Sequence, residues 1–270
     1  MSATAPLFQE KITSWNTRLS QNNHQSLIRE EPLSIRIQGK PYSVVMRTPG
    51  NEIAHAAGFC LAEGIVDTSN DIKNIAYCDG EESNVVTVTL TPERYAKVVV
   101  SHLDRRAYIS QTSCGLCGKE LVSEIQQAIY PIKTNFKVSV TKIIKCIRAL
   151  PSIQPLRQQT GATHATAIYD ENFSLLASAE DVGRHNALDK TMGQLFLENR
   201  LSQTALLILS SRISYEMVQK AARAGTAIIV AYSRPTELAV KLAESLNITL
   251  ACLTKDGGML IFCHPKRLLT

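Results

Sequence analysis

The sequence predicts an α/β protein with two lobes, and three observations support this fold class. Its 270 residues allow one large domain or two small ones, because single cores usually stop growing at about 250 to 300 residues. From about residue 138, apolar strands alternate with amphipathic helices, which indicates a largely parallel sheet covered by helices. The earlier part instead shows a hairpin pattern and a β-branched run, which favour a smaller α+β lobe.

The first part of the chain divides into an arm and the smaller lobe. Residues 1–26 are polar, rich in Gln, Asn and Ser, and lack periodicity, so we expect a flexible arm. The lobe, residues 27–135, opens with the alternating segment 33–46, which predicts a β-hairpin. A helix that Asn51 can cap follows, and the run 85–90 predicts a buried strand before a second helix.

The larger lobe, residues 136–270, is predicted from the alternation of apolar runs and amphipathic segments. We expect helices at 140–150, 182–197, 213–224 and 236–246, and strands at 164–169, 175–177, 205–209, 226–231 and 248–253.

Composition and charge narrow the class of protein. The net charge is +5, but Lys and Arg are spread along the chain and aromatic residues make up only 6%, so a nucleic-acid partner is not expected. No segment resembles a secretory signal or the ~18 apolar residues of a membrane span, so we expect a cytoplasmic protein without a membrane partner. The seven cysteines, an odd and scattered set, are expected to be reduced.

A pair of thiols lies in the glycine-flanked motif CGLCG, residues 114–118. A thiol that accepts and releases sulfur must be accessible and partly ionised, because the thiolate is the attacking species. The two glycines leave room for a partner, and the amino end of the helix predicted to follow favours the anion. Cys114 and Cys117 are therefore the candidate catalytic residues of a persulfide relay.

Two other kinds of site use the same cysteine spacing. A structural zinc site needs a second pair of ligands, and the chain has no further C-x-x-C or C-x-x-H, so no metal is expected. A thioredoxin-type dithiol is the stronger alternative, although that motif usually follows the first strand of a small βαβ domain. Cys60, Cys146 and Cys252 lie in apolar patterns and are expected to be buried.

Hydroxyl groups, cations and glycines follow three of the predicted strands. The carboxyl ends of parallel strands meet at one edge of a sheet, and helix amino ends with nearby hydroxyls and Arg bind anions there. We therefore expect a nucleotide or another phosphorylated ligand at this edge, with simple helix capping by the serines as the alternative. The three segments are Ser210-Ser211-Arg212, Ser233-Arg234-Pro235 and Thr254-Lys255-Asp256-Gly257-Gly258.

The segment EDVGRHNALDK, residues 180–190, is dense in polar groups where a helix is expected to begin. Asp181, His185 and Asp189 recur at helical spacing, which would place them along one face. Such a face can orient His185 as a donor or proton relay, and a solvated helix surface is the alternative. His164 lies in a predicted strand, where a satisfied core residue is more typical than a ligand.

Six motifs that run in order along nearly the whole chain also resemble those of a known family. They are GFCLAEG (58–64), SCGLCG (113–118), GATHAT (161–166), EDVGRHNALDK (180–190), SSRISYEMVQKA (210–221) and HPKRL (264–268). Together they resemble the FdhD family of formate dehydrogenase accessory sulfurtransferases.

The resemblance implies a sulfur carrier that receives persulfide sulfur from a cysteine desulfurase on Cys114, with help from Cys117. Its acceptor would be the molybdenum bis(molybdopterin guanine dinucleotide) cofactor required by formate dehydrogenase, for which GDP is a mimic. The resemblance also implies a three-layer α/β/α lobe similar to cytidine deaminase, with cofactor-binding residues from Thr254 to Met259. The helix starts that bind zinc in deaminases carry no cysteine in this chain, so zinc deamination is not expected.

The residues leave two further functions open. The chain could be a non-catalytic chaperone of cofactor and client enzyme, or a dithiol oxidoreductase. Because the implied cofactor has two similar guanine ends, we also expect a symmetric homodimer with one site per subunit.

Overall fold

The computed structural model describes residues 5–15, 20–78, 84–98 and 129–269. The first part contains β1 (Leu7–Trp15), β2 (Ser20–Ile28), β3 (Glu31–Ile37), β4 (Lys40–Arg47), α1 (Glu52–Ala62), β5 (Ile72–Tyr77), β6 (Val85–Leu90) and α2 (Pro92–Val98). The second part contains β7 (Val138–Ser139), α4 (Val140–Ala149), α5 (Pro155–Thr160), β8 (His164–Tyr169), β9 (Leu175–Asp181), α6 (Arg184–Leu197), β10 (Leu206–Leu209), α7 (Tyr215–Arg223), β11 (Ile228–Ala231), α8 (Glu237–Ser245), β12 (Thr249–Leu253), β13 (Met259–Cys263) and β14 (Leu268–Leu269).

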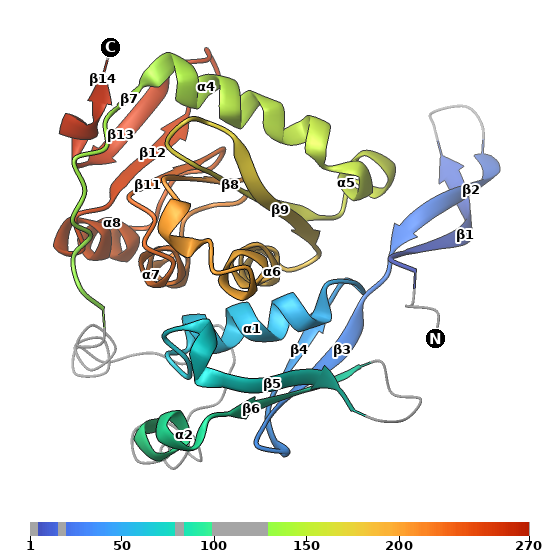
Figure 1. The fold of residues 1–270 in the computed structure, drawn as a ribbon. Coiled ribbons are helices and arrows are strands. Elements are labelled where there is room, and N and C mark those ends of the chain that lie inside the picture. The colour runs from blue at the N-terminus through green and yellow to red at the C-terminus, as the bar shows by residue number, and fades with distance from the viewer. Residues whose placement is uncertain (1–4, 16–19, 79–83, 99–128, 270) are drawn as a thin grey trace.

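Two sheets lie on either side of a double layer of helices (Figure 1). The smaller sheet has four strands in the order β4-β3-β6-β5, and α1 packs on it. The larger sheet has six strands in the order β13-β12-β11-β10-β8-β9. Helices α6, α7 and α8 cover its inner face, while α4 covers the outer one (Figure 1). The mixed α/β class expected from the sequence is confirmed.

The larger sheet is less parallel than predicted. Only the pairs β10–β11 and β11–β12 are parallel, whereas β8–β9, β8–β10 and β12–β13 are antiparallel. The reason is the short connection between β8 and β9 and between β12 and β13. Two strands joined by a tight turn can only pair antiparallel, since a parallel pair needs a long crossover.

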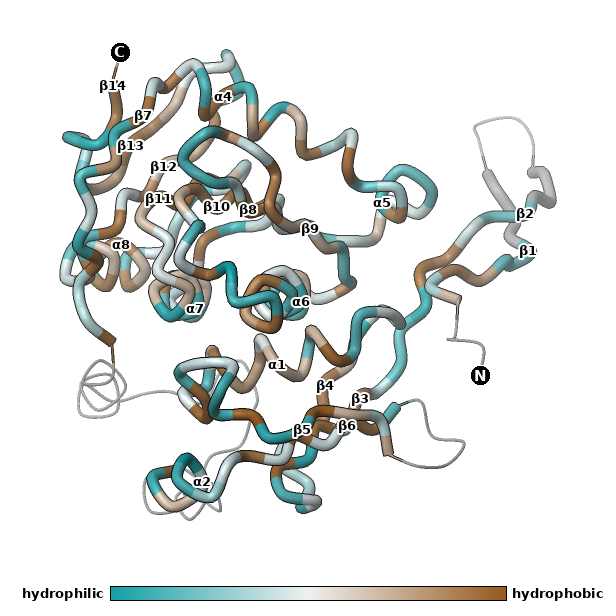
Figure 2. Tube along the Cα trace, viewed as in Figure 1, coloured by the Kyte–Doolittle hydropathy of each residue, from teal (hydrophilic) through white to brown (hydrophobic). Residues whose placement is uncertain are grey.

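Within residues 1–26, where the sequence predicts a flexible arm, the structure has an antiparallel hairpin formed by β1 and β2. Phe8 lies opposite Leu27 in this ladder, and both are about half exposed. The hairpin is held by backbone pairing, and its polar sequence lacks the alternation that identifies a strand. In Figure 2 this arm is largely teal, whereas most strands of the larger sheet are brown.

Helices α1 and α6 cross at very close range. A Cβ added to Gly58 would lie 1.9 Å from the carbonyl oxygen of Asp189, and one added to Gly193 would lie 1.7 Å from that of Ala54. Such distances are far below van der Waals contact, so only glycine fits at either position. The hydrophobic core therefore continues from the smaller sheet through this crossing to the inner face of the larger sheet.

A buried ion pair fastens the same junction. The Asp181 carboxylate, fully buried, lies 2.7 Å from Lys190 Nζ and accepts a hydrogen bond of 3.0 Å from Thr48 N. Lys190 also donates to the Thr48 carbonyl oxygen at 2.7 Å. Because Thr48 belongs to the first part of the chain, the pair holds the end of β4 against α6.

Candidate functional site

The carboxyl ends of three strands lie together at one edge of the larger sheet. Leu209, Ala231 and Leu253 end β10, β11 and β12, which are neighbours in parallel pairs. Neighbouring strands are ~4.8 Å apart, so the loops after β10 and β12 start about 10 Å from each other. The structure therefore gathers the three predicted polar segments within the length of a nucleotide.

The serines after β10 are engaged in the fold itself. Ser210 Oγ accepts a hydrogen bond of 2.8 Å from Ala165 N, and the buried Ser211 donates its hydroxyl to the Arg212 carbonyl oxygen at 2.9 Å. The N-cap of α7 is Ser214, so the alternative in which Ser210 or Ser211 caps that helix is wrong. Arg212 is exposed, which leaves its guanidinium as the group of this segment best placed for an external anion.

His185 lies in the first turn of α6 at the same edge. Its Nδ1 is 3.0 Å from Glu216 Oε2 of α7. Burial, together with the positive charges of Lys220, Arg184 and Arg212, lowers the pKa of His185 to about 3. The ring is therefore neutral near pH 7 and donates its Nδ1–H to the carboxylate.

We expect His185 to remain neutral down to about pH 4 in a titration of the folded protein. Its folded pKa, about 3, lies below the ordinary histidine value of 6.5, so below pH 6.5 the unfolded chain binds a proton that the folded chain excludes. This residue therefore destabilises the fold progressively as the pH falls from 6.5 toward 3. NMR titration of the imidazole signals, assigned with His185→Asn, measures the pKa, and a value above 6 contradicts the expectation.

The helical face predicted from Asp181, His185 and Asp189 is wrong. Asp181 ends strand β9 rather than lying in α6, and it is bound by Lys190. Asp189 is buried and paired with Lys220, whose Nζ lies 2.6 Å from its Oδ1. Neither carboxylate orients His185.

The structure adds two basic residues to this edge: Arg184, which the sequence analysis did not single out, and His164, which it interpreted as a core residue. Burial and the neighbouring Arg212 lower the pKa of Arg184, whose buried Nε has no hydrogen-bond partner among the described residues. His164 Nδ1 lies 3.5 Å from Ser210 Oγ, and burial, Arg184 and Arg157 lower its pKa. The edge therefore carries an excess of positive charge, which favours an anionic ligand.

Residues 254–258 form the turn between β12 and β13, which Met259 then begins, and backbone hydrogen bonds of 2.8 and 3.1 Å close the turn. Gly257 has φ +87°, and a Cβ there would lie 2.5 Å from a guanidinium nitrogen of Arg148. Hydrogen bonds from a neighbouring hydroxyl and from backbone N–H groups lower the pKa of Asp256. Lys255 and Asp256 are exposed at the tip, so the turn offers a cation at the edge, while the backbone N–H groups of Thr254 and Gly257 are engaged within the turn.

Five of the seven cysteines lie in the described residues. The predicted burial of Cys60, Cys146 and Cys252 is confirmed, and Cys263 is buried as well. Burial raises the pKa of the Cys146, Cys252 and Cys263 thiols and so disfavours the reactive thiolate. Cys78 is half-buried.

The predicted catalytic pair, Cys114 and Cys117, lies outside the described residues. Within the part that the structure describes, no group of three or more His, Cys, Asp or Glu residues is placed to hold a metal ion. The described helices also include none that is long and apolar enough to cross a membrane.

The fold and this edge define a mixed α/β protein with a cationic rim on its larger sheet. Comparison with known proteins then identifies its family: the chain belongs to the FdhD/NarQ family, whose profile matches residues 28–269. Sulfur carrier protein FdhD of Streptomyces coelicolor is 38% identical over 256 residues, covering 90% of this chain and 88% of its own. The Bordetella bronchiseptica protein of that name is 35% identical, covering 92% and 88%.

A solved crystal structure shows the same fold. It is that of a Desulfotalea psychrophila protein described as a formate dehydrogenase accessory protein, with a TM-score of 0.77 and 23% identity. The match covers 97% of this chain and 99% of that one.

Proposed function

We propose that the chain is a sulfur carrier that receives persulfide sulfur from a cysteine desulfurase on Cys114 and delivers it to the molybdenum bis(molybdopterin guanine dinucleotide) cofactor of formate dehydrogenase. Its relatives at 35% to 38% identity are named sulfur carrier proteins, which supports this role. The observation that carries the assignment to particular residues is the burial of the other thiols. Four of the five described cysteines are buried, so the CGLCG pair is the best candidate for a carrier.

The relay needs two thiol exchanges. The Cys114 thiolate attacks the outer sulfur of the donor persulfide, the donor S–S bond breaks, and the donor cysteine leaves as a thiolate. For delivery, the Cys117 thiolate attacks the Cys114 sulfur that carries the outer sulfur. That step forms a Cys114–Cys117 disulfide and releases the outer sulfur as hydrosulfide to the acceptor. The disulfide must then be reduced by an external thiol before another cycle.

The cationic edge is the proposed binding site of the cofactor. Arg212, with Arg184 beside it, can contact the phosphates, and neutral His185 can donate to an oxygen if its ring leaves Glu216. The segment Thr254 to Met259 adds the exposed ammonium group of Lys255. A cytidine-deaminase-like lobe, a homodimer with one site per subunit and a cytoplasmic location complete the proposal.

Intact-mass measurement tests the central step. The protein is incubated with a cysteine desulfurase and cysteine, and peptide mapping then locates the added sulfur. One added sulfur atom on Cys114 is expected. Sulfur on Cys60, Cys146 or Cys252 instead would overturn the assignment.

Arg212→Ala is expected to weaken GDP binding by roughly 1.5 to 3 kcal/mol, because it removes a charge-assisted hydrogen bond to phosphate. Calorimetry measures the affinity. Arg200→Ala is the matched control, since Arg200 is a surface arginine beyond the other end of α6. Unchanged affinity in both Arg212→Ala and Lys255→Ala would remove the proposed cofactor site and leave the persulfide step standing.

A further inference from the structure

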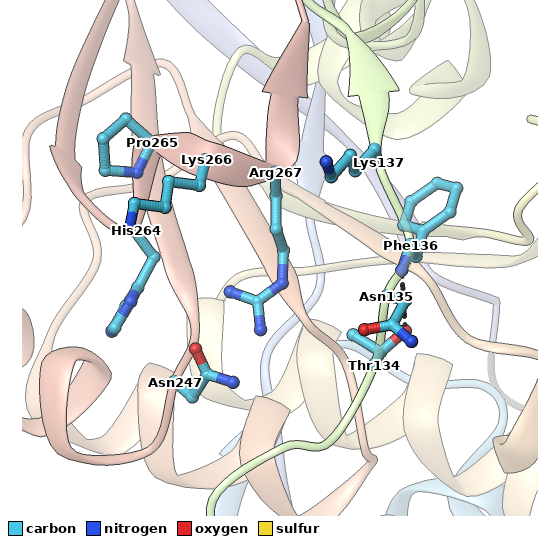
Figure 3. A pocket seen from close by; sticks show the side chains of 9 residues that line it. All are labelled: Thr134, Asn135, Phe136, Lys137, Asn247, His264, Pro265, Lys266 and Arg267. Carbon is cyan, nitrogen blue, oxygen red and sulfur yellow. Dashed lines mark hydrogen bonds between the residues drawn. The ribbon is translucent and has the colours of Figure 1, made fainter.

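A second cationic recess lies at the other edge of the larger sheet (Figure 3). It borders the start of β12 and the end of β13, whereas the candidate site lies beyond the end of β12. Its volume is about 420 Å³. The residues that line it are Thr134, Asn135, Phe136, Lys137, Asn247, His264, Pro265, Lys266 and Arg267.

Two segments far apart in the sequence build this recess. β14 pairs in parallel with β7, with Leu268 opposite Val138, which brings residues 264–267 beside residues 134–137. Asn247 ties the start of β12 to the segment before residue 134, since its Nδ2 donates to the Ile132 carbonyl oxygen at 2.8 Å. The recess is therefore held by backbone pairing rather than by a loose loop.

Arg267 is the central group of the recess. It is only 8% exposed, and Figure 3 shows its guanidinium pointing into the space between Asn247 and Asn135. One nitrogen, Nη1, donates to Thr249 Oγ1 at 3.3 Å, and Nε has no hydrogen-bond partner among the described residues. No carboxylate of the described chain lies within ion-pair distance of it. A buried guanidinium without a counter-charge lowers the stability of the fold, and an anion bound from solvent would neutralise its charge.

The charged residues around Arg267 are all positive. Lys137 and Lys266 are exposed at the rim, and no Asp or Glu lines the recess. The ring of His264 is engaged by the backbone, with Nε2 3.0 Å from the Glu244 carbonyl oxygen. Three cations thus surround a space that is large enough for a small molecule.

We propose that this recess binds the phosphate group of a small phosphorylated ligand. A carboxylate offers two oxygens, whereas a phosphate monoester offers three, which better match one guanidinium and two ammonium groups. The volume leaves room for the organic part of the ligand. β12 separates the two sites by its five residues, roughly 16 Å, so this site is distinct from the proposed cofactor edge.

AMP is the probe, with malonate as the carboxylate counterpart, and calorimetry at low salt gives the affinity of the full chain. Arg267→Gln is expected to weaken AMP binding by about tenfold to a hundredfold, and Lys137→Gln/Lys266→Gln, which changes only exposed residues, by at least about tenfold. Arg267→Lys should restore little, because it keeps the charge but loses the planar fork.

The side-chain amide signals of Asn135 and Asn247 in an NMR spectrum locate the ligand and separate this site from the cofactor edge. They are expected to shift on adding AMP in the parent and in Arg212→Ala alike. The proposal is overturned if they do not shift, if the double Lys variant binds AMP like the parent, or if malonate binds as tightly as AMP.

Discussion

Gly193→Ala is expected to lower the free energy of unfolding by about 3 kcal/mol or more, although it adds a single methyl group. Helix propensity alone would stabilise the variant by ~1 kcal/mol, because alanine is the better helix former. The methyl carbon would however lie 1.7 Å from the Ala54 carbonyl oxygen, so α1 and α6 must move apart. That movement opens the core that both sheets share, and this loss outweighs the gain in propensity.

Gln194→Ala is the matched control, since Gln194 is the next residue of α6 and is exposed. Urea or thermal unfolding followed by circular dichroism gives both values. Gly58→Ala should behave like Gly193→Ala, because its methyl carbon meets the Asp189 carbonyl oxygen at 1.9 Å. If Gly193→Ala proves as stable as Gln194→Ala, the close crossing is not the native arrangement.

Cys114→Ala is expected to abolish persulfide loading from a cysteine desulfurase. Burial raises the pKa of Cys146, Cys252 and Cys263, which disfavours the attacking thiolate at these three positions. Cys78→Ala, which removes a half-buried thiol, serves as the control and should load like the parent. Undiminished loading in Cys114→Ala would refute the assignment of the carrier thiol to Cys114, whereas no loading of the parent would favour a chaperone without a catalytic thiol.

Cys117→Ala should separate the two exchange steps. Loading needs only Cys114, so it should persist, whereas release of sulfur should slow because no neighbouring thiol can form the disulfide. Intact mass before and after adding an acceptor thiol measures both steps. Turnover of a generic protein disulfide by the parent, lost in both variants, would point to the dithiol oxidoreductase instead.

The periodic elements were predictable because each buries an apolar face. The strand 164–169 and the run 85–90 match β8 and β6, and the helix expected at 140–150 is α4. By contrast, β13 and the β1–β2 hairpin were missed. Leu260 and Ile261 of β13 are each 40% exposed, so this edge strand lacks the burial pattern that identifies a strand.

The candidate site was predictable in part, for a similar physical reason. Parallel strand ends must meet, so the segments after β10 and β12 could be placed at one edge from their order alone. The partner of His185 could not be predicted, because Glu216 belongs to another helix and a contact between helices leaves no local pattern in the sequence. Arg184 could have been found from the sequence, because it lies between Gly183 and His185 at the start of a helix. The density of charges in this segment did not by itself single it out.

The crossing of α1 and α6 also limits how this protein can move. Enzymes with two lobes often close around a ligand by bending at a hinge, which requires an interface that separates at little cost. Here one hydrophobic core runs through the contact between the sheets, and Lys190 binds both Asp181 and the Thr48 carbonyl oxygen there. Opening it would break the hydrogen bonds that Thr48 makes with Asp181 and Lys190 and expose the shared core, so the two sheets are expected to move as one frame. Any motion that accompanies sulfur transfer must then come from segments attached to this frame.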